Sequence, residues 1–172
     1  MNNRHEGFTL LEVVVALSVL IVVFGGVVSL IVMMSESEKH AKNGQIAALL
    51  ASEALELVRY KRDLNYILDA SPFSDIADET DAEVYSFTIN YDGSVAPSST
   101  SDVSQADILY SGTFYTQTVV SSPTFFRRLV TTTYHAAAGP LPARIDIAVE
   151  VYWKDDTKQD TYTLTSELLD IE

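Results

Sequence analysis

The strongest constraint on this chain is a run of 23 residues without a charge, from Val13 to Ser35. Valine, leucine and isoleucine dominate the run, and no polar face interrupts it at helical spacing. A helix rises 1.5 Å per residue, so the run is long enough to cross the ~30 Å hydrocarbon core of a bilayer. The alternative is a buried helix of a soluble protein, but such helices normally carry a polar face. The sequence therefore predicts one membrane-spanning helix.

The residues around this run do not form an ordinary secretory signal peptide. The first seven residues, MNNRHEG, are polar, and the apolar stretch that follows exceeds the roughly 7–15 residues of a signal peptide. The segment after the run, Met33 to Glu38, offers no small-x-small cleavage site. We therefore expect the helix to be retained.

One carboxylate, Glu12, lies inside the start of the apolar stretch. A charge at membrane depth costs on the order of a few kcal/mol, so an ionisable residue there is a candidate functional residue. The alternative is that Glu12 lies at the level of the lipid headgroups, with access to water.

The residues Gly7-Phe8-Thr9-Leu10-Leu11-Glu12, followed by an apolar helix, resemble the N-terminal signal of type IV prepilins and secretion pseudopilins. The resemblance combines a short polar leader, a glycine before the cut, a phenylalanine after it, and a glutamate four residues beyond. It implies that a prepilin peptidase cuts between Gly7 and Phe8 and methylates the new amino group of Phe8. It also implies that Glu12 neutralises the terminal ammonium of a neighbouring subunit during assembly.

Three features depart from the usual family pattern. The leader has Arg4 as its one definite positive charge, and Glu6 stands where lysine, arginine or glutamine is more usual. The first proline of the chain is Pro72, so the membrane helix lacks the proline that many major pilins carry. The pair Gly25-Gly26 is the one obvious weak point of this helix, where it could bend or pack closely against another helix.

Helical patterning continues beyond a polar junction at residues 35–43. Apolar residues recur at three-, four- and seven-residue steps, which predicts an amphipathic helix with Gly44 as a candidate hinge. Ala70-Ser71-Pro72 should end this helix, because the residue before a proline avoids helical geometry. The predicted helix is ~90 Å long. Its apolar stripe is expected to contain Ile46, Leu49, Leu50, Ala54, Leu57, Leu64 and Leu68.

The helical segment from Ala47 to Arg59 resembles the corresponding helix of minor pilins of the V type and of minor pseudopilin I of type II secretion. This resemblance implies an accessory subunit. An alanine-, leucine- and glutamate-rich helix with no further meaning is the alternative.

After Pro72, apolar residues recur at every second position, which predicts strands. Alternation from Tyr85 to Tyr91 predicts a strand that turns at Asp92-Gly93, and 96–106 is expected to be a loop. Segments 108–120, with a candidate interruption at Ser111-Gly112, and 125–134 are further strand candidates. The clearest hairpin has alternating residues 145–153, a turn at 154–158, and Tyr162, Leu164 and Leu168 on the return strand.

These elements predict an α+β fold of the pilin kind, in which four or five largely antiparallel strands pack on the second half of the helix. The expected organisation is a cleaved leader (1–7), a membrane or filament-core helix (8–34), its amphipathic continuation (35–69) and a β-rich extracytoplasmic head (70–172).

Composition excludes several functions. The net charge of −13 argues against binding nucleic acid or anionic lipid by charge, and the absence of cysteine excludes disulfides and thiolate chemistry.

The sequence shows no serine elbow, phosphate loop or zinc motif, so neither an enzyme nor a cofactor is predicted. Asp155, Asp156 and Asp160 fit no EF-hand spacing, and no metal site is predicted. Of Arg127-Arg128, one could pair with a carboxylate of the head, but an ordinary surface position is favoured.

The sequence therefore predicts a minor or accessory subunit of a type IV pilus-like filament, anchored in the cytoplasmic membrane. Its expected partners are the prepilin peptidase, other pilin or pseudopilin subunits and the membrane. A type II secretion or competence pseudopilin is one alternative. A monomeric single-span membrane protein with a ligand-binding or enzymatic head is another, and a tip adhesin is compatible with the first interpretation.

Overall fold

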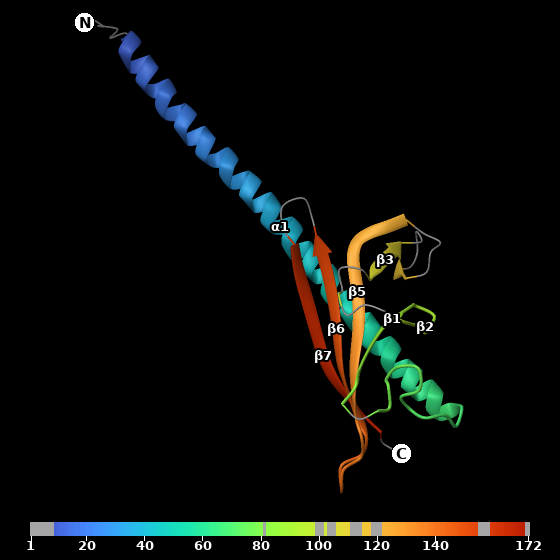
Figure 1. Ribbon diagram of the computed structural model, residues 1–172. Coiled ribbons are helices and arrows are strands. Elements are labelled where there is room, and N and C mark those ends of the chain that lie inside the picture. Colours follow the sequence, from blue (N-terminus) through green and yellow to red (C-terminus); the bar gives the residue numbers. More distant parts are fainter. Residues whose placement is uncertain are drawn as a thin grey trace, which may run out of the picture. The chain divides into compact units, whose positions relative to one another are not determined.

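The computed structural model of the chain describes residues 9–80, 82–98, 102, 106–110, 115–117, 122–154 and 159–170. Within these residues, one helix is followed by seven strands (Figure 1). The elements are α1 (Leu10–Ile67), β1 (Val84–Ile89), β2 (Val95–Pro97), β3 (Asp107–Tyr110), β4 (Tyr115–Thr116), β5 (Ser122–His135), β6 (Arg144–Lys154) and β7 (Gln159–Leu169). The chain divides into two compact units, Met1–Lys42 and Asn43–Glu172, and α1 contributes to both.

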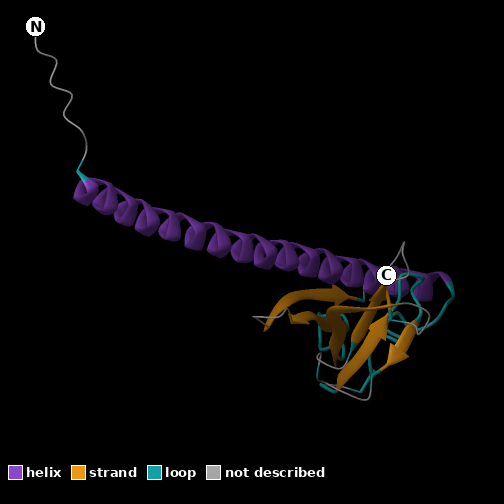
Figure 2. Ribbon diagram, turned by 90° about the horizontal axis from the view of Figure 1, so that it is seen from above, coloured by secondary structure: helices purple, strands orange, loops and turns teal. Residues whose placement is uncertain are grey.

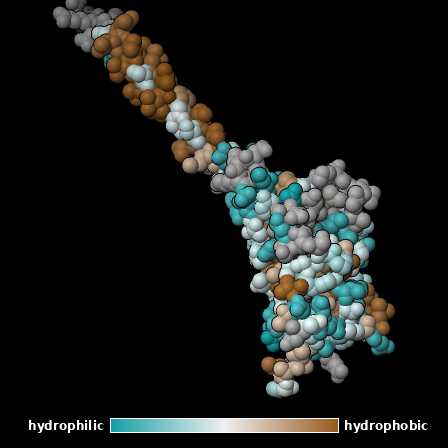
Figure 3. All heavy atoms as spheres, in the orientation of Figure 1, coloured by the Kyte–Doolittle hydropathy of each residue, from teal (hydrophilic) through white to brown (hydrophobic). Residues whose placement is uncertain are grey.

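In the first unit, α1 exposes apolar side chains on every side. All described residues up to Lys39 are exposed, and brown, apolar atoms cover most of the described helix of this unit (Figure 3). The helix is long and apolar enough to cross a membrane. It continues through Gly25-Gly26 without interruption, so no break in helical structure accompanies the glycine pair.

In the second unit, α1 is amphipathic and buries one stripe of mostly small or branched apolar residues. This stripe contains Ala47, Leu50, Ala51, Ala54, Leu55, Val58 and Asn65. Its position corrects two residues of the predicted stripe, because Leu49 and Leu68 are exposed. Leu49 lies about 200° around the helix from Ala47, since each residue turns by about 100°. Leu68 lies beyond the last residue of the helix.

The helix ends at Ile67, shortly before the predicted stop at Ala70-Ser71-Pro72, and a side chain fixes the turn that follows. Asn65 is buried, and its Nδ2 donates to the carbonyl oxygens of Pro72 at 3.1 Å and Ser74 at 2.9 Å. Asp69 has a φ of 54°, the left-handed conformation that commonly terminates helices. The chain is thereby turned back from α1 toward the sheet.

The strands form one antiparallel sheet in which β5 is central. One side of β5 pairs with β6, and the other pairs with β1 and β3 over different parts of its length. β7 extends the sheet beyond β6, β2 beyond β1, and β4 beyond β3. Figure 2 shows the strands beside the part of α1 that belongs to the second unit. One core joins them, and it includes Val58 from α1, Phe87 from β1 and Val149 from β6. The predicted α+β class is confirmed.

The β6–β7 hairpin matches the predicted alternation. Its inner face buries Ile145, Ile147, Val149, Val151 and Trp153, while the intervening residues are half-buried or exposed. The predicted turn residues 155–158 lie outside the described residues.

Two strand predictions need correction. Residues Val95–Pro97 form β2, which overlaps the segment predicted as a loop at 96–106. This strand closes a hairpin with β1 through the predicted Asp92-Gly93 turn, where Gly93 has a φ of 77°. The sheet also has seven described strands where four or five were predicted, because β2 and β4 contain only three and two residues. Ser111-Gly112 lies outside the described residues.

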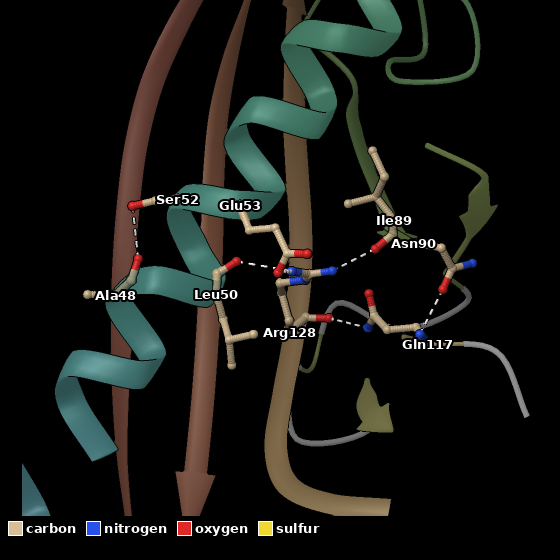
Figure 4. A network of polar contacts seen from close by, with 8 residues as sticks. All are labelled: Ala48, Leu50, Ser52, Glu53, Ile89, Asn90, Gln117 and Arg128. Atoms are coloured by element: carbon tan, nitrogen blue, oxygen red, sulfur yellow. Dashed lines mark hydrogen bonds and ion pairs between the residues drawn. The ribbon is translucent and has the colours of Figure 1, made fainter. Parts of the chain in front are cut away.

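Arg128 is a fully buried cation between α1 and the sheet (Figure 4). Its Nη1 donates to the Leu50 carbonyl oxygen at 3.0 Å and to Glu53 Oε2 at 3.2 Å, and its Nη2 donates to the Ile89 carbonyl oxygen at 2.7 Å. The favoured surface position is therefore wrong for Arg128. The alternative is correct in giving Arg128 a carboxylate partner, but that partner lies on α1 and not in the predicted head. Burial lowers the pKa of the Arg128 guanidinium, and the neighbouring Glu53 carboxylate opposes this effect.

A second polar residue, Gln117, which follows β4, forms hydrogen bonds to Arg128 and to Asn90. Its side-chain Nε2 donates to the Arg128 carbonyl oxygen at 2.7 Å, and its backbone N donates to Asn90 Oδ1 at 2.7 Å (Figure 4). Buried polar groups of this kind need partners, and here the partners come from segments far apart in sequence.

Candidate assembly site at the start of the helix

Thr9 is the N-cap of α1. The Glu12 backbone N donates to the Thr9 carbonyl oxygen at 3.1 Å and to Thr9 Oγ1 at 3.3 Å, and the Val13 backbone N also reaches the Thr9 carbonyl at 3.3 Å. The bonds to Thr9 satisfy the Glu12 N–H, one of the donors that the first turn would otherwise leave orphaned, and the Val13 bond is the first regular bond of the helix. The sequence analysis did not identify this cap. The signal was present as Thr9-x-x-Glu12, the spacing of a capping box.

Glu12 occupies the first turn of α1, at the third helical residue. A negative charge is favoured there, because the helix N-terminus carries a partial positive charge. The side chain is exposed and has no hydrogen-bond or ion-pair partner among the residues that the structure describes. The helix therefore positions a carboxylate that is available to a cation from outside the described chain.

Glu12 is the one charged residue between Leu10 and Ser35, and its neighbours along the helix are apolar. The hydroxyl of Ser18, the next polar side chain, donates back to the carbonyl oxygens of Val14 at 2.7 Å and Val15 at 2.9 Å. Such back-bonding satisfies a hydroxyl within the helix itself. Between Leu10 and Ser35, the helix thus offers one charged side chain on an apolar surface, and this side chain has no partner among the described residues.

Of the three predicted site residues, only Glu12 is described. Gly7 and Phe8, the predicted cleavage and methylation residues, lie outside the described residues. Among the residues that are described, no group of three or more His, Cys, Asp or Glu side chains could hold a metal ion. Asp155 and Asp156 also lie outside that part of the chain.

Comparison with known protein families gives a match that includes this site. Residues 2–28 match the protein family described as the prokaryotic N-terminal methylation motif, and this span includes Gly7, Phe8 and Glu12. No curated protein and no solved structure matches the chain. The motif is the type IV prepilin signature, and it coincides here with a long apolar N-terminal helix and an α+β fold. The chain carries the type IV prepilin signature, which indicates a single-pass, membrane-anchored protein of the type IV pilin-like or pseudopilin kind.

Proposed function

We propose that this chain is a minor or accessory subunit of a type IV pilus-like filament, with the second unit on the extracytoplasmic side of the cytoplasmic membrane. A prepilin peptidase cuts it between Gly7 and Phe8 and methylates the new amine. The observation that carries the proposal is the Glu12 carboxylate, which lies in the capped first turn of an apolar helix, inside the matched motif, and has no partner among the described residues.

The chemistry of assembly follows from charge. Cleavage after Gly7 creates an ammonium on Phe8, close to the apolar run. In the low dielectric of a filament core, an isolated charge is strongly penalised, whereas a matched pair is penalised much less. The Glu12 carboxylate of one subunit therefore pairs with the Phe8 ammonium of its neighbour. This pairing favours one axial register between subunits, even where it adds little net stability.

An accessory role is favoured over a major subunit by two features of the sequence. The membrane run lacks a proline, and the whole chain has no cysteine to stabilise a head exposed to an oxidising compartment. Pseudopilins of type II secretion or competence systems share the methylation signature and its assembly chemistry. The proposed organisation is a leader at 1–7, a filament-core helix at 8–34, its continuation at 35–69 and the head at 70–172.

Intact mass and N-terminal sequencing test the processing step. Protein is purified from membranes of cells with and without a prepilin peptidase. We expect a chain that starts at methylated Phe8 in the first case and an uncut chain in the second. An uncut chain in both cases would leave a plain membrane-anchored protein and contradict the proposal.

Glu12→Gln tests the assembly step. It removes the charge, keeps the shape of the side chain and leaves the Thr9 cap in place. We expect normal membrane insertion and cleavage but loss of most incorporation into filaments, measured as the fraction of protein in sheared filaments. Glu36→Gln is the matched control, because it makes the same change elsewhere on the same helix. Equal incorporation of both variants would refute the role of Glu12.

A further inference from the structure

The outer strands of the sheet differ in how well they are protected against further pairing. β2 has three residues and ends at Pro97, which has no N–H to donate, and β4 has two residues. β7 has 11 residues and pairs only with β6 among the described residues. Short strands and prolines are common protections of exposed edges. The β7 edge lacks both and presents a row of backbone donors and acceptors about 36 Å long.

The middle of β7 offers a regular, uncharged edge. The segment 161–166, TYTLTS, has no charge, proline or glycine, and its pairing with β6 has no bulge. Tyr162 and Leu164 point to the inner face and pack on the core, yet they are only half-buried. A strand added to this edge would cover the rest of their apolar surface.

An open hollow lies beside this edge, on the face of the sheet that points away from the core. Its volume is about 400 Å³, and β5, β6 and β7 all contribute to its lining. Ala148 of β6 lies directly between Thr131 of β5 and Thr165 of β7. Because the alanine side chain is small, it leaves room between the two threonines. The hydroxyl of Thr133 and the carboxylate of Asp146 also line the hollow.

One carboxylate next to the hollow has no partner among the described residues. Glu150 is two residues from Ala148 on the same face of β6, about 7 Å along the strand, and lies directly opposite Thr163 of β7. Its side chain is half-buried, and it forms no hydrogen bond or ion pair with any described residue. A partly desolvated carboxylate is stabilised by a cation, so Glu150 favours a positively charged ligand group.

The charges at the other end of the hollow are already matched within the chain. Asp146 Oδ2 is 2.9 Å from His135 Nε2, and its Oδ1 is 3.9 Å from Arg144 Nε. Glu167, which lies opposite Asp146 on β7, is paired with Arg144 at 3.1 Å. The uncompensated charge beside the hollow is therefore that of Glu150.

The chemistry of the hollow fits an arginine side chain. The hydroxyls of Thr131, Thr133 and Thr165 can accept hydrogen bonds, and a guanidinium group has five N–H donors and no acceptor. Neighbouring strands are about 4.8 Å apart, so a residue added opposite Thr165 lies about 10 Å from Ala148. A long side chain from that residue extends across Thr165 into the hollow, toward Glu150.

A second copy of this chain in the same membrane does not supply the added strand. Two β7 edges that pair antiparallel in one sheet give their α1 helices opposite directions. Chains anchored in one membrane by the first half of α1 cannot adopt that arrangement. The other outer strands, β2 and β4, are too short to match β7 and contain no arginine. The added strand therefore comes from a different protein.

We propose that the β7 edge and the hollow bind an extended segment of a different protein, which joins the sheet as a strand and places an arginine opposite Thr165. Hydrogen bonds to the β7 backbone supply affinity, and the arginine in the hollow supplies specificity. The residues on either side of the arginine are apolar, because they lie on the face of Tyr162 and Leu164. This contact is separate from the role of Glu12 and does not depend on it.

A labelled peptide with the sequence Val-Thr-Val-Arg-Val-Thr-Val tests the proposal. It reads the same in both directions, so its arginine faces Thr165 whichever way the strand runs. Binding to the full-length protein in detergent is measured by fluorescence anisotropy. We expect saturable binding, and we expect the same peptide with citrulline, a neutral analogue of arginine, to bind several-fold more weakly. No binding of the arginine peptide, or equal binding of both peptides, would overturn the proposal.

Glu150→Gln identifies the carboxylate that recognises the arginine. It should weaken binding of the arginine peptide several-fold and leave binding of the citrulline peptide unchanged. Glu56→Gln makes the same change on the exposed face of α1 and should alter neither. Unchanged Trp153 fluorescence shows that each variant is folded. A full preference for the arginine peptide in the Glu150→Gln variant would refute the assigned site.

Disulfide trapping tests the strand register, because the chain has no cysteine of its own. The peptide Val-Cys-Val-Arg-Val-Cys-Val places a cysteine opposite Thr163 in either direction. Thr163→Cys should therefore link to it several-fold more than Thr161→Cys, which is also exposed on β7 but about 7 Å farther along the strand. Equal linking at the two positions would mean that the peptide is not held as a strand in this register, and the proposal would fail.

Discussion

The two halves of α1 share one backbone geometry but expose their apolar side chains to different surroundings. In the first unit, valine, leucine and isoleucine cover every side of the helix and none is buried within the chain. In the second unit, apolar residues are concentrated on one stripe that packs on the sheet. The comparison shows that helix formation and burial are separate requirements. Hydrogen bonds within the helix satisfy the backbone in both halves, while the sequence pattern determines what must cover the side chains.

A pair of valines makes this difference concrete. Val22 is 75% exposed and must be covered by lipid or by neighbouring subunits, whereas Val58 is 0% exposed and is covered by the chain itself. The same substitution at these positions should therefore produce two different failures.

The largest expected effect is that of Val58→Asp. It places an unpaired carboxylate in the core and removes a packed side chain, which costs more than about 4 kcal/mol, a large part of the stability of a small domain. We expect the second unit to unfold. The measurement is the fluorescence of Trp153, the single tryptophan, which is buried in that unit, in full-length protein in detergent.

Val22→Asp is the matched control. It should weaken membrane insertion by about 3 kcal/mol while leaving Trp153 fluorescence unchanged. Insertion is measured as resistance to alkaline extraction from membranes. If Val22→Asp unfolded the second unit, or if Val58→Asp left it intact, the assignment of the two halves to different surroundings would be wrong.

A smaller effect is expected at the polar bond between the second half of α1 and the sheet. Glu53→Gln removes the negative charge that faces the fully buried Arg128. Removing one partner of a fully buried pair costs about 3–5 kcal/mol. The Glu53 side chain is 39% exposed, so we expect only about 1–3 kcal/mol, measured by urea unfolding of the full-length protein.

Two further variants sharpen this result. Glu56→Gln breaks an exposed ion pair with Arg59 on the same helix and should change stability by less than about 0.5 kcal/mol. Adding Arg128→Met to Glu53→Gln should restore most of the lost stability, because the buried charge then disappears. Equal losses for Glu53→Gln and Glu56→Gln would mean that the Arg128 bond contributes no more than a surface pair.

Periodicity was sufficient to predict the helix and the β6–β7 hairpin. The charge-free run and the alternation of Ile145 to Trp153 are long, strong patterns, and the structure follows both. The prediction was weaker where a single residue decides the outcome. Leu49 was placed in the core stripe because leucine is apolar, although small alanines such as Ala47 and Ala51 form the actual contact.

The long-range polar contacts could not be predicted from the sequence, for a different reason. Glu53 and Arg128 are separated by 75 residues, and only the fold brings them together. Arg127 and Arg128 are indistinguishable by type, and the strand register decides which of them faces α1. At the candidate site, the motif pointed to Glu12, and the Thr9 cap was encoded locally but unrecognised.

The smallest expected effect comes from replacing a glycine in each half of α1 by alanine. Gly44 lies within α1 at the start of the second unit, and an added Cβ would meet nothing within 4 Å. Gly44→Ala should raise the free energy of unfolding of that unit by about 0.5–1 kcal/mol, because alanine loses less backbone entropy in a helix. Gly25→Ala is equally free of clashes but lies in the first unit, so it should leave the Trp153 unfolding midpoint unchanged. A loss of stability with Gly44→Ala would indicate that the chain needs a hinge at Gly44, and a shift with Gly25→Ala would mean that the two halves unfold together.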